Sequence, residues 1–219
     1  MLITEIKPAE ELTKSLDKKI AVIRCIGCRE AYFPWEKIED FVSYLPKLGI
    51  EVILDFSADY LCNPEYAKVY YEENKSCMDA CDRVLIFSCG VGVQVFSSIV
   101  EKIVVAGCNT LYIDGFQGFM PAEYSCAQCG NCILTLTAGI CPITQCSKSL
   151  LHGPCGGAKN SKCEVDSVLK QGIECGWEKI YQRAKKLNLL HKLGEIKIDR
   201  LHDYHRIILE SEKKVILNT

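Results

Sequence analysis

This sequence has no excess of charge of either sign and no long apolar stretch. Its 26 Lys and Arg residues nearly balance its 28 Asp and Glu residues, for a formal net charge of −2. That balance gives no signal for binding nucleic acid. No segment approaches the roughly 18 uncharged apolar residues of a membrane span, and the charged N-terminus lacks the apolar core of a secretory signal. We therefore expect no nucleic-acid partner, no membrane insertion and a cytoplasmic location.

Motifs for bond-making chemistry are also missing. We find no Ser, His and Asp in triad order, no pair of catalytic carboxylates and no phosphate-binding P-loop. The stretch Cys89-Gly90-Val91-Gly92 has two glycines of a dinucleotide-binding turn, but it lacks the third glycine and an acidic residue about 20 positions later. We expect no catalytic residue in the chain. We interpret these glycines as a turn where the backbone passes close to a bound group.

Cysteine, in contrast, is abundant, with 15 residues in the chain. Thiols stay reduced inside the cell, so a disulfide framework is not expected in a chain without a secretory signal. At 219 residues the chain is also long enough to bury a hydrophobic core without covalent cross-links. Some of the cysteines will be ordinary core residues, because free cysteine is among the most buried residue types. So large a number nevertheless indicates metal ligation.

Short β-branched runs alternate with helical patterns over residues 19–114, as in βαβ units around a parallel sheet. We therefore expect an α/β domain over 1–120, with an open, Rossmann-like parallel sheet. The expected strands are KIAVIRC (19–25), IEVILDF (50–56), RVLIFSC (83–89) and TLYIDG (110–115). The expected helices are 35–48, 64–80 and 93–103, of which the first has apolar residues at helical spacing and Gly49 at its exit.

The pattern changes at about residue 121. Residues 121–192 are dense in Cys, Gly, Pro and Ser and show no sustained period before an amphipathic helix over 175–190. Such a segment cannot offset the entropy of its ordering by apolar burial alone, so we expect bound metal to hold it. For the remaining residues, 193–219, the sequence pattern predicts a C-terminal arm with strand-like runs. Its apolar runs would either dock a partner or pack within the molecule.

The strongest metal signal is a run of cysteines at successive x2 spacings, followed by a Cys-Pro pair. Such runs bind 4Fe–4S clusters in bacterial ferredoxins, where the Cys-Pro cysteine serves the other cluster, whereas structural zinc favours separated pairs. By that analogy Cys146 is the expected fourth ligand of the run Cys126, Cys129 and Cys132. Cys141 is then expected to join Cys155, Cys163 and Cys175. Iron–sulfur is favoured, and zinc is the alternative.

A second constellation depends on the fold. The carboxyl ends of parallel strands meet at one edge of a sheet, where ligands bind. Four cysteines lie at or just after the ends of the expected strands, and Cys108 lies near the next one; the four are Cys25, Cys28, Cys62 and Cys89. Each of them alone is better explained as a small core residue. Together they form a possible further cluster site, so we expect two 4Fe–4S clusters, and three if this set also binds one.

The segment ICPITQCSKSLLHGPCGGAKNSKCEV (140–165), followed by CGWEKIYQR (175–183), resembles the cysteine-rich C-terminal domain associated with methylenetetrahydrofolate reductases. In acetogenic bacteria this domain occurs in a separate iron–sulfur small subunit of the MetV type. The upstream SCGVGVQ stretch (88–94) is similar to that subunit too. At the N-terminal end, RCIGCREAYF (24–33) departs from the family's more glycine- and cysteine-rich opening. The positions that match the family's cysteines are Cys126, Cys129, Cys132, Cys141, Cys146, Cys155, Cys163 and Cys175.

The resemblance implies an electron-transfer role. It implies a catalytic partner subunit with a (β/α)8 barrel that holds the flavin and the folate and reduces methylenetetrahydrofolate to methyltetrahydrofolate. This chain would relay electrons to that flavin from ferredoxin or another low-potential donor. The chain has too few βα units to form the barrel itself. The competing reading is a zinc-bound scaffold that assembles a reductase without taking part in redox chemistry.

Overall fold

The structure is a computed structural model that describes residues 1–113 and 123–196. Its centre is a four-stranded parallel sheet, in which each strand pairs in register with its neighbours. The strand order is β4-β2-β5-β6. The four strands are β2 (Lys19–Cys25), β4 (Glu51–Ala58), β5 (Arg83–Phe87) and β6 (Ile103–Ala106). The expected α/β fold with a parallel sheet is confirmed.

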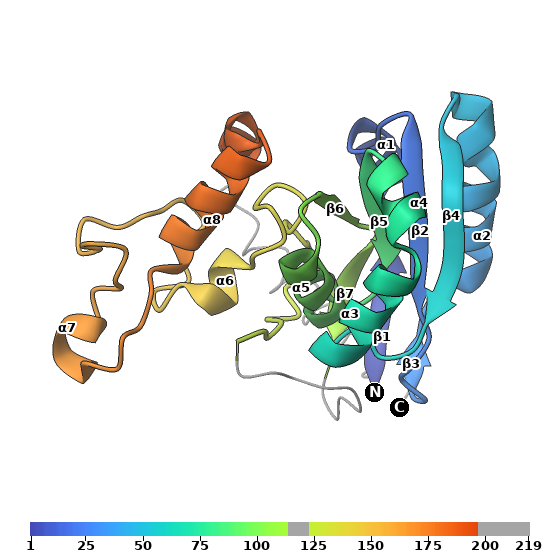
Figure 1. The fold of residues 1–219 in the computed structure, drawn as a ribbon. Helices are drawn as coiled ribbons and strands as arrows, with labels where there is room; N and C mark the ends of the chain where they lie inside the picture. The colour runs from blue at the N-terminus through green and yellow to red at the C-terminus, as the bar shows by residue number, and fades with distance from the viewer. Residues whose placement is uncertain (114–122, 197–219) are drawn as a thin grey trace.

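Helices cover both faces of this sheet (Figure 1). Helix α2 (Trp35–Tyr44) lies on one face and continues into the 3-10 turn η1 (Leu45–Leu48), which ends at the left-handed Gly49. The opposite face carries α3 (Pro64–Glu73), α4 (Lys75–Ala80) and α5 (Gly90–Ile99). Helix α5 is buried almost throughout, because its sequence GVGVQVFSSI is apolar on nearly every side. The parallel strands are likewise continuous apolar runs, as expected for a sheet covered on both faces.

A second, three-stranded sheet lies beside the first, in the order β3-β1-β7. It consists of β1 (Leu2–Ile6), β3 (Ala31–Tyr32) and β7 (Cys108–Tyr112), with β1 antiparallel to β7 and parallel to β3. The short helix α1 (Ala9–Lys14) follows β1. One hydrophobic core joins both sheets and their helices.

Three details differ from the sequence expectation. The segment 110–115 was expected in the parallel sheet, but β7 instead pairs antiparallel with β1. Helix α5 ends at Ile99, so that Ile103 begins strand β6 of the parallel sheet rather than closing the helix. This is consistent with the β-branched content of the IVVA sequence of β6. The helix expected over 64–80 divides at Asn74 into α3 and α4.

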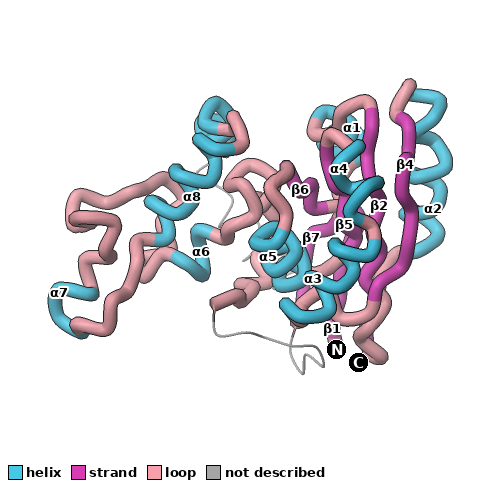
Figure 2. Tube along the Cα trace, in the orientation of Figure 1, coloured by secondary structure: helices cyan, strands magenta, loops and turns pink. Residues whose placement is uncertain are grey.

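Residues from about 135 to 196 form a lobe that projects from the α5 and β6 side of the domain (Figure 1). Most of the lobe is loop, as Figure 2 shows. Its helical elements are α6 (Pro142–Gln145), α7 (Asp166–Leu169), α8 (Gly176–Lys186) and the 3-10 helix η2 (Leu190–Glu195). Helix α8 buries Trp177, Ile180 and Ala184 as its spacing predicts, whereas Tyr181 is exposed. Nearly all of the expected C-terminal arm lies outside the described residues.

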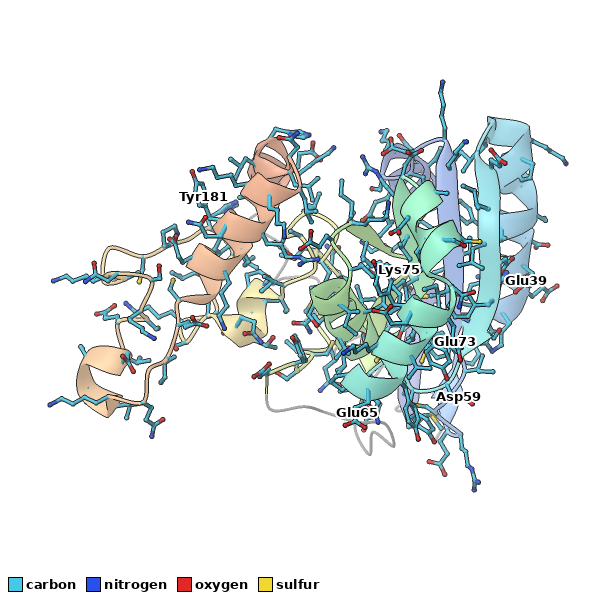
Figure 3. All side chains as sticks on the ribbon, viewed as in Figure 1. Glu39, Asp59, Glu65, Glu73, Lys75 and Tyr181 are labelled. Carbon is cyan, nitrogen blue, oxygen red and sulfur yellow. The ribbon has the colours of Figure 1, made fainter. Side chains whose placement is uncertain are left out.

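The outer surface of the α/β domain carries both acidic and apolar side chains, among them the exposed Tyr66 and Val69 of α3. Figure 3 shows Glu39 of α2 and Glu65 of α3 at this surface, and both are exposed. None of the helices in the described part of the chain is long and apolar enough to cross a membrane.

Candidate metal centres

Four cysteines from the segment 126–141 line one cavity next to helix α5. We call Cys126, Cys129, Cys132 and Cys141 the cavity set. Gly90 and Gln94 of α5 and Thr110 of β7 also line the cavity, and the remaining lining is small or apolar: Ala127, Ile133, Leu134 and Ile143. Among the described residues that line it, none is a carboxylate or a histidine. Thiols in an apolar setting are the ligands that iron–sulfur clusters use, and they also suit zinc.

Hydrogen bonds to acceptors in the α/β domain fix the backbone around the cavity set. The Cys132 N–H donates to Oδ1 of Asn109 on β7 at 2.9 Å. The Cys141 N–H donates to Oε1 of the buried Gln94 at 3.2 Å. Gly130, whose φ of +71° favours glycine, donates its N–H to the Thr110 carbonyl at 3.1 Å. The loop that carries the cysteines is therefore held by β7 and α5.

Burial controls the acidity of two of these thiols, Cys132 and Cys126. It raises the pKa of Cys132 to about 12, although the nearby Lys7 ammonium lowers it in part. It raises the pKa of Cys126 to about 11, against hydrogen bonds from the Gln128 N–H and the Thr110 hydroxyl. A buried thiolate without a cation is therefore unfavourable here, whereas a bound metal would stabilise the deprotonated form.

The second group consists of Cys25, Cys28, Cys62 and Cys89, which we call the strand-end set. Cys25 ends β2, Cys62 follows β4, and Cys89 caps the start of α5 directly after β5. Burial, together with the neighbouring thiols Cys25 and Cys62, raises the pKa of Cys28 to about 11. Burial also raises the pKa of Cys89 well above its ordinary value, and Cys25, Cys126 and Cys62 contribute. The structure thus brings the four predicted cysteines together, and their binding of a metal stays a prediction.

Cys108 does not join the strand-end set. It begins β7 on the second sheet and is buried. Burial raises its pKa to about 12, and its nearest influences are the Thr4 hydroxyl, Cys132 and Lys7. Cys108 is therefore a neighbour of Cys132, but it does not line the cavity.

The remaining predicted ligands lie in the lobe, and we call Cys146, Cys155, Cys163 and Cys175 the lobe set. The Cys163 Sγ lies 3.3 Å from the hydroxyl of Ser147, the residue after Cys146, and this hydrogen bond lowers the pKa of Cys163. The Cys155 Sγ lies 3.8 Å from a carboxylate oxygen of Glu164, the residue after Cys163. Cys146 ends α6 and Cys175 precedes α8, where both cysteines belong to one hydrophobic cluster. The structure therefore places Cys146 with Cys175 in one cluster, and the convergence of all four cysteines stays a prediction.

The cavity lining differs from the expected partition of ligands in one respect. Cys141, and not Cys146, lines the cavity with the run of three cysteines. Helix α6 lies between the two cysteines, since Cys141 precedes its first residue and Cys146 follows its last. Cys146 instead packs against the small hydrophobic cluster around Trp177. The assignment of either cysteine to a metal centre stays a prediction.

Sequence reasoning did not identify the residues that surround the thiols. Gln94, Thr110 and Lys7 all contact the cavity set or its backbone. A glutamine inside the apolar sequence GVGVQVF was a usable signal, because a buried polar side chain needs hydrogen-bond partners. Lys7 and Thr110 gave no such signal, because their positions depend on the pairing of β1 with β7.

Within residues 1–113 and 123–196, no group of three or more His, Cys, Asp and Glu side chains stands at the spacing needed to hold a metal ion. The support for the three sets is therefore the shared cavity, the mutual influence of the thiols and the chemistry of the donors. Metal ligation at each set stays a prediction.

Residues 105–204 match the protein-family model described as Methylene-tetrahydrofolate reductase C terminal. The matched range contains the cavity set, the lobe set and helix α8. No curated protein and no solved structure matches the chain significantly. This cysteine-rich part of the chain is therefore similar to the C-terminal region of methylenetetrahydrofolate reductases.

Proposed function

We propose that this protein is the iron–sulfur electron-transfer subunit of a methylenetetrahydrofolate reductase, of the MetV type. It takes electrons from ferredoxin or another low-potential donor. It passes them to the flavin of a catalytic partner, which reduces methylenetetrahydrofolate to methyltetrahydrofolate. The isolated chain is not itself the catalyst.

The cavity set is the observation that carries this proposal. Four thiols line one cavity, three of them at ferredoxin-like spacing, within the range that matches the reductase family model. A 4Fe–4S cluster bound there supplies one-electron redox chemistry. The chain's own residues hold the cluster through the four thiolates, and the apolar side chains of Ile133, Leu134 and Ile143 exclude water from it. Backbone N–H groups such as that of Gln128, 3.4 Å from the Cys126 Sγ, stabilise negative charge on sulfur.

The division of labour with a partner follows from the fold. The described residues form an open four-stranded parallel sheet and a three-stranded sheet, and they do not include a closed (β/α)8 barrel. They also lack the complete glycine-rich turn of a dinucleotide site at the start of α5. We therefore assign the flavin and the folate to the partner subunit.

The decisive experiment is a metal analysis of the full chain, purified without oxygen. We expect about four iron and four acid-labile sulfide for each bound cluster, and an EPR signal after reduction with dithionite. Stoichiometric zinc without iron or sulfide would contradict the proposal. Mixing the reduced chain with the flavin-bearing subunit should then reduce the flavin.

A matched pair of variants tests the cavity set. Cys129→Ala should lose about one cluster's worth of iron, because it removes one of four ligands. Cys77→Ala should keep the full iron content, since Cys77 lies on α4 and belongs to none of the three sets. Full iron in Cys129→Ala would show that Cys129 is not a ligand.

A zinc-bound scaffold is the second candidate, and the lobe set is the observation that favours it. These four cysteines lie in a lobe with a small hydrophobic core, and structural zinc supplies folding energy to small domains of this kind. Zinc at the lobe set together with iron at the other sets would mean that one chain has both a structural zinc site and an electron-transfer role. Zinc at all three sets would exclude electron transfer and leave the scaffold as the function.

A further inference from the structure

Helix α5 begins between two of the cysteine sets. Cys89, its N-cap residue, has Cys25 and Cys62 of the strand-end set and Cys126 of the cavity set among its neighbours. Gly90, the first residue of the helix, lines the cavity of the cavity set. The backbone at the start of α5 therefore lies against both groups of thiols.

The contact between Gly90 and the cavity set is very close. A Cβ atom built on Gly90 would lie 2.9 Å from the Cys126 Sγ, closer than real side chains approach. The absence of a side chain thus allows the backbone to touch a sulfur of the cavity set. The φ angle at Gly90 is not in the left-handed region, so this contact, and not the turn, explains the need for glycine.

Hydrogen bonds fix this contact on both sides. The Gly90 N–H donates to the Thr110 Oγ1 at 3.0 Å, and the Thr110 hydroxyl in turn hydrogen-bonds the Cys126 sulfur. The Gly90 carbonyl accepts a bond from Nε2 of Gln94 at 3.1 Å. The same nitrogen donates to the carbonyl of Ser125, the residue before Cys126, at 2.8 Å. Buried hydrogen bonds of this kind hold a single arrangement.

We propose that the Cys89–Gly90 segment is the electron bridge between two metal centres, one held by the strand-end set and one by the cavity set. This inference rests on the proposed function, because it requires a redox centre at each set. The segment carries one electron from the reduced centre to the oxidised one, and no bond or proton changes. Electron transfer slows steeply with distance, so a covalent segment that ends against the sulfur of the second site is an efficient path.

The bridge predicts a magnetic interaction between the two centres. We would reduce the anaerobic full chain with dithionite and record its EPR spectrum beside those of Cys62→Ala and Cys129→Ala, each of which keeps one of the two sites. The spectrum of the unaltered chain should show splitting or broadening that the sum of the two variant spectra lacks. A spectrum equal to that sum would overturn the bridge while leaving the proposed function intact. An absence of iron and sulfide from the unaltered chain would overturn both.

Gly90→Ala tests the path itself. Alanine favours a helix, so the variant acts through the contact with Cys126, whose sulfur must move away from the added Cβ atom. In this variant we expect the magnetic interaction between the two centres to weaken. The EPR signal of the centre at the cavity set should shift, and that of the centre at the strand-end set should stay unchanged. Gly194→Ala is the matched control, because a Cβ atom there meets nothing within 4 Å. An unaltered spectrum for Gly90→Ala would contradict the proposed path.

Discussion

Lys7 places a buried positive charge at the edge of the cavity set. Its side chain is 2% exposed. Its Nζ donates to the Cys132 carbonyl at 2.6 Å and also pairs with Glu11, which is partly exposed. Its charge lowers the pKa of both Cys132 and Cys108 against the effect of their burial. A fixed cation in this position stabilises negative charge on the neighbouring sulfurs.

We predict that Lys7→Met lowers the reduction potential of the cavity-set cluster. Reduction adds negative charge to a cluster, so removal of a nearby cation disfavours the reduced state. The shift should be on the order of tens of millivolts, as for other changes of charge near a cluster. EPR-monitored redox titration measures it. Lys14→Met is the control, since Lys14 forms an ion pair with Glu10 at the same i, i+4 spacing in full solvent. Equal potentials in Lys7→Met and the unaltered chain would show that Lys7 has only a structural role.

At this scale the sequence singles out the candidate cysteines, but not the residues around them. Ligation by these cysteines stays a prediction, which depends on their number and spacing. The supporting residues depend on contacts between distant segments. The Cys132 N–H, for example, meets Asn109 only because β7 runs beside the cysteine loop.

Helix α8 is joined to the α/β domain by Arg183, by an ion pair of Lys186 with Glu101 and by apolar packing near Ile103. The guanidinium of Arg183 donates to the carbonyls of Ala138 and Val100, each at 2.8 Å, and to that of Ser97. Ser97 and Val100 lie at the end of α5, where the last carbonyl groups of a helix lack partners within it. Arg183 therefore caps α5 while it joins the lobe to the domain.

We predict that Arg183→Ala releases α8 without unfolding the α/β domain. The loss of three charge-assisted hydrogen bonds should cost about 2–4 kcal/mol of local stability. Such a loss corresponds to hydrogen exchange in α8 that is roughly 30-fold faster or more. Exchange monitored by mass spectrometry gives the rates for α8 and the parallel sheet separately. Lys185→Ala, on the exposed side of the same helix, should leave both rates unchanged. Faster exchange throughout the sheet would contradict the prediction.

Elements with local signals were predicted well, whereas those that depend on distant pairing were not. Strands β2, β4 and β5 were found because each is a continuous β-branched run. Strand β1 was missed, because LITEI is short and is followed by charged residues. Its pairing with β7 joins residues about 100 positions apart, which no local pattern specifies.

Over the whole molecule, the cysteine sets divide according to the hydrophobic cores. The strand-end set and most of the cavity set pack against the large core of the α/β domain. Two members of the lobe set, Cys146 and Cys175, instead belong to a small separate cluster around Trp177 and Ile180. Sequence spacing cannot reveal this division, because the fold decides which cysteines meet. The lobe, with its small core, should therefore depend on metal more than the domain does.

The chain has two tryptophans, one in the α/β domain and one in the lobe. The fluorescence of each tryptophan therefore reports on the folding of its own region. Trp177 is 3% exposed, donates from Nε1 to the Leu150 carbonyl at 2.8 Å and packs against Gly153. Trp35 lies in the α/β domain, where it stacks on Phe33 with ring centroids 4.9 Å apart. Replacing either tryptophan with phenylalanine leaves the other as the only source of tryptophan fluorescence.

We predict that removal of metal unfolds the lobe and leaves the α/β domain folded. After anaerobic treatment with a chelator, the Trp35→Phe variant should show a red shift in emission, because Trp177 becomes exposed to water. The Trp177→Phe variant should keep its emission, since the large core holds Trp35 in place without metal. The physical reason is that binding energy at the lobe set supplies the folding energy that the small lobe core lacks. If Trp177 stays buried after the metal has been removed, apolar packing alone holds the lobe, and the lobe set has no structural role.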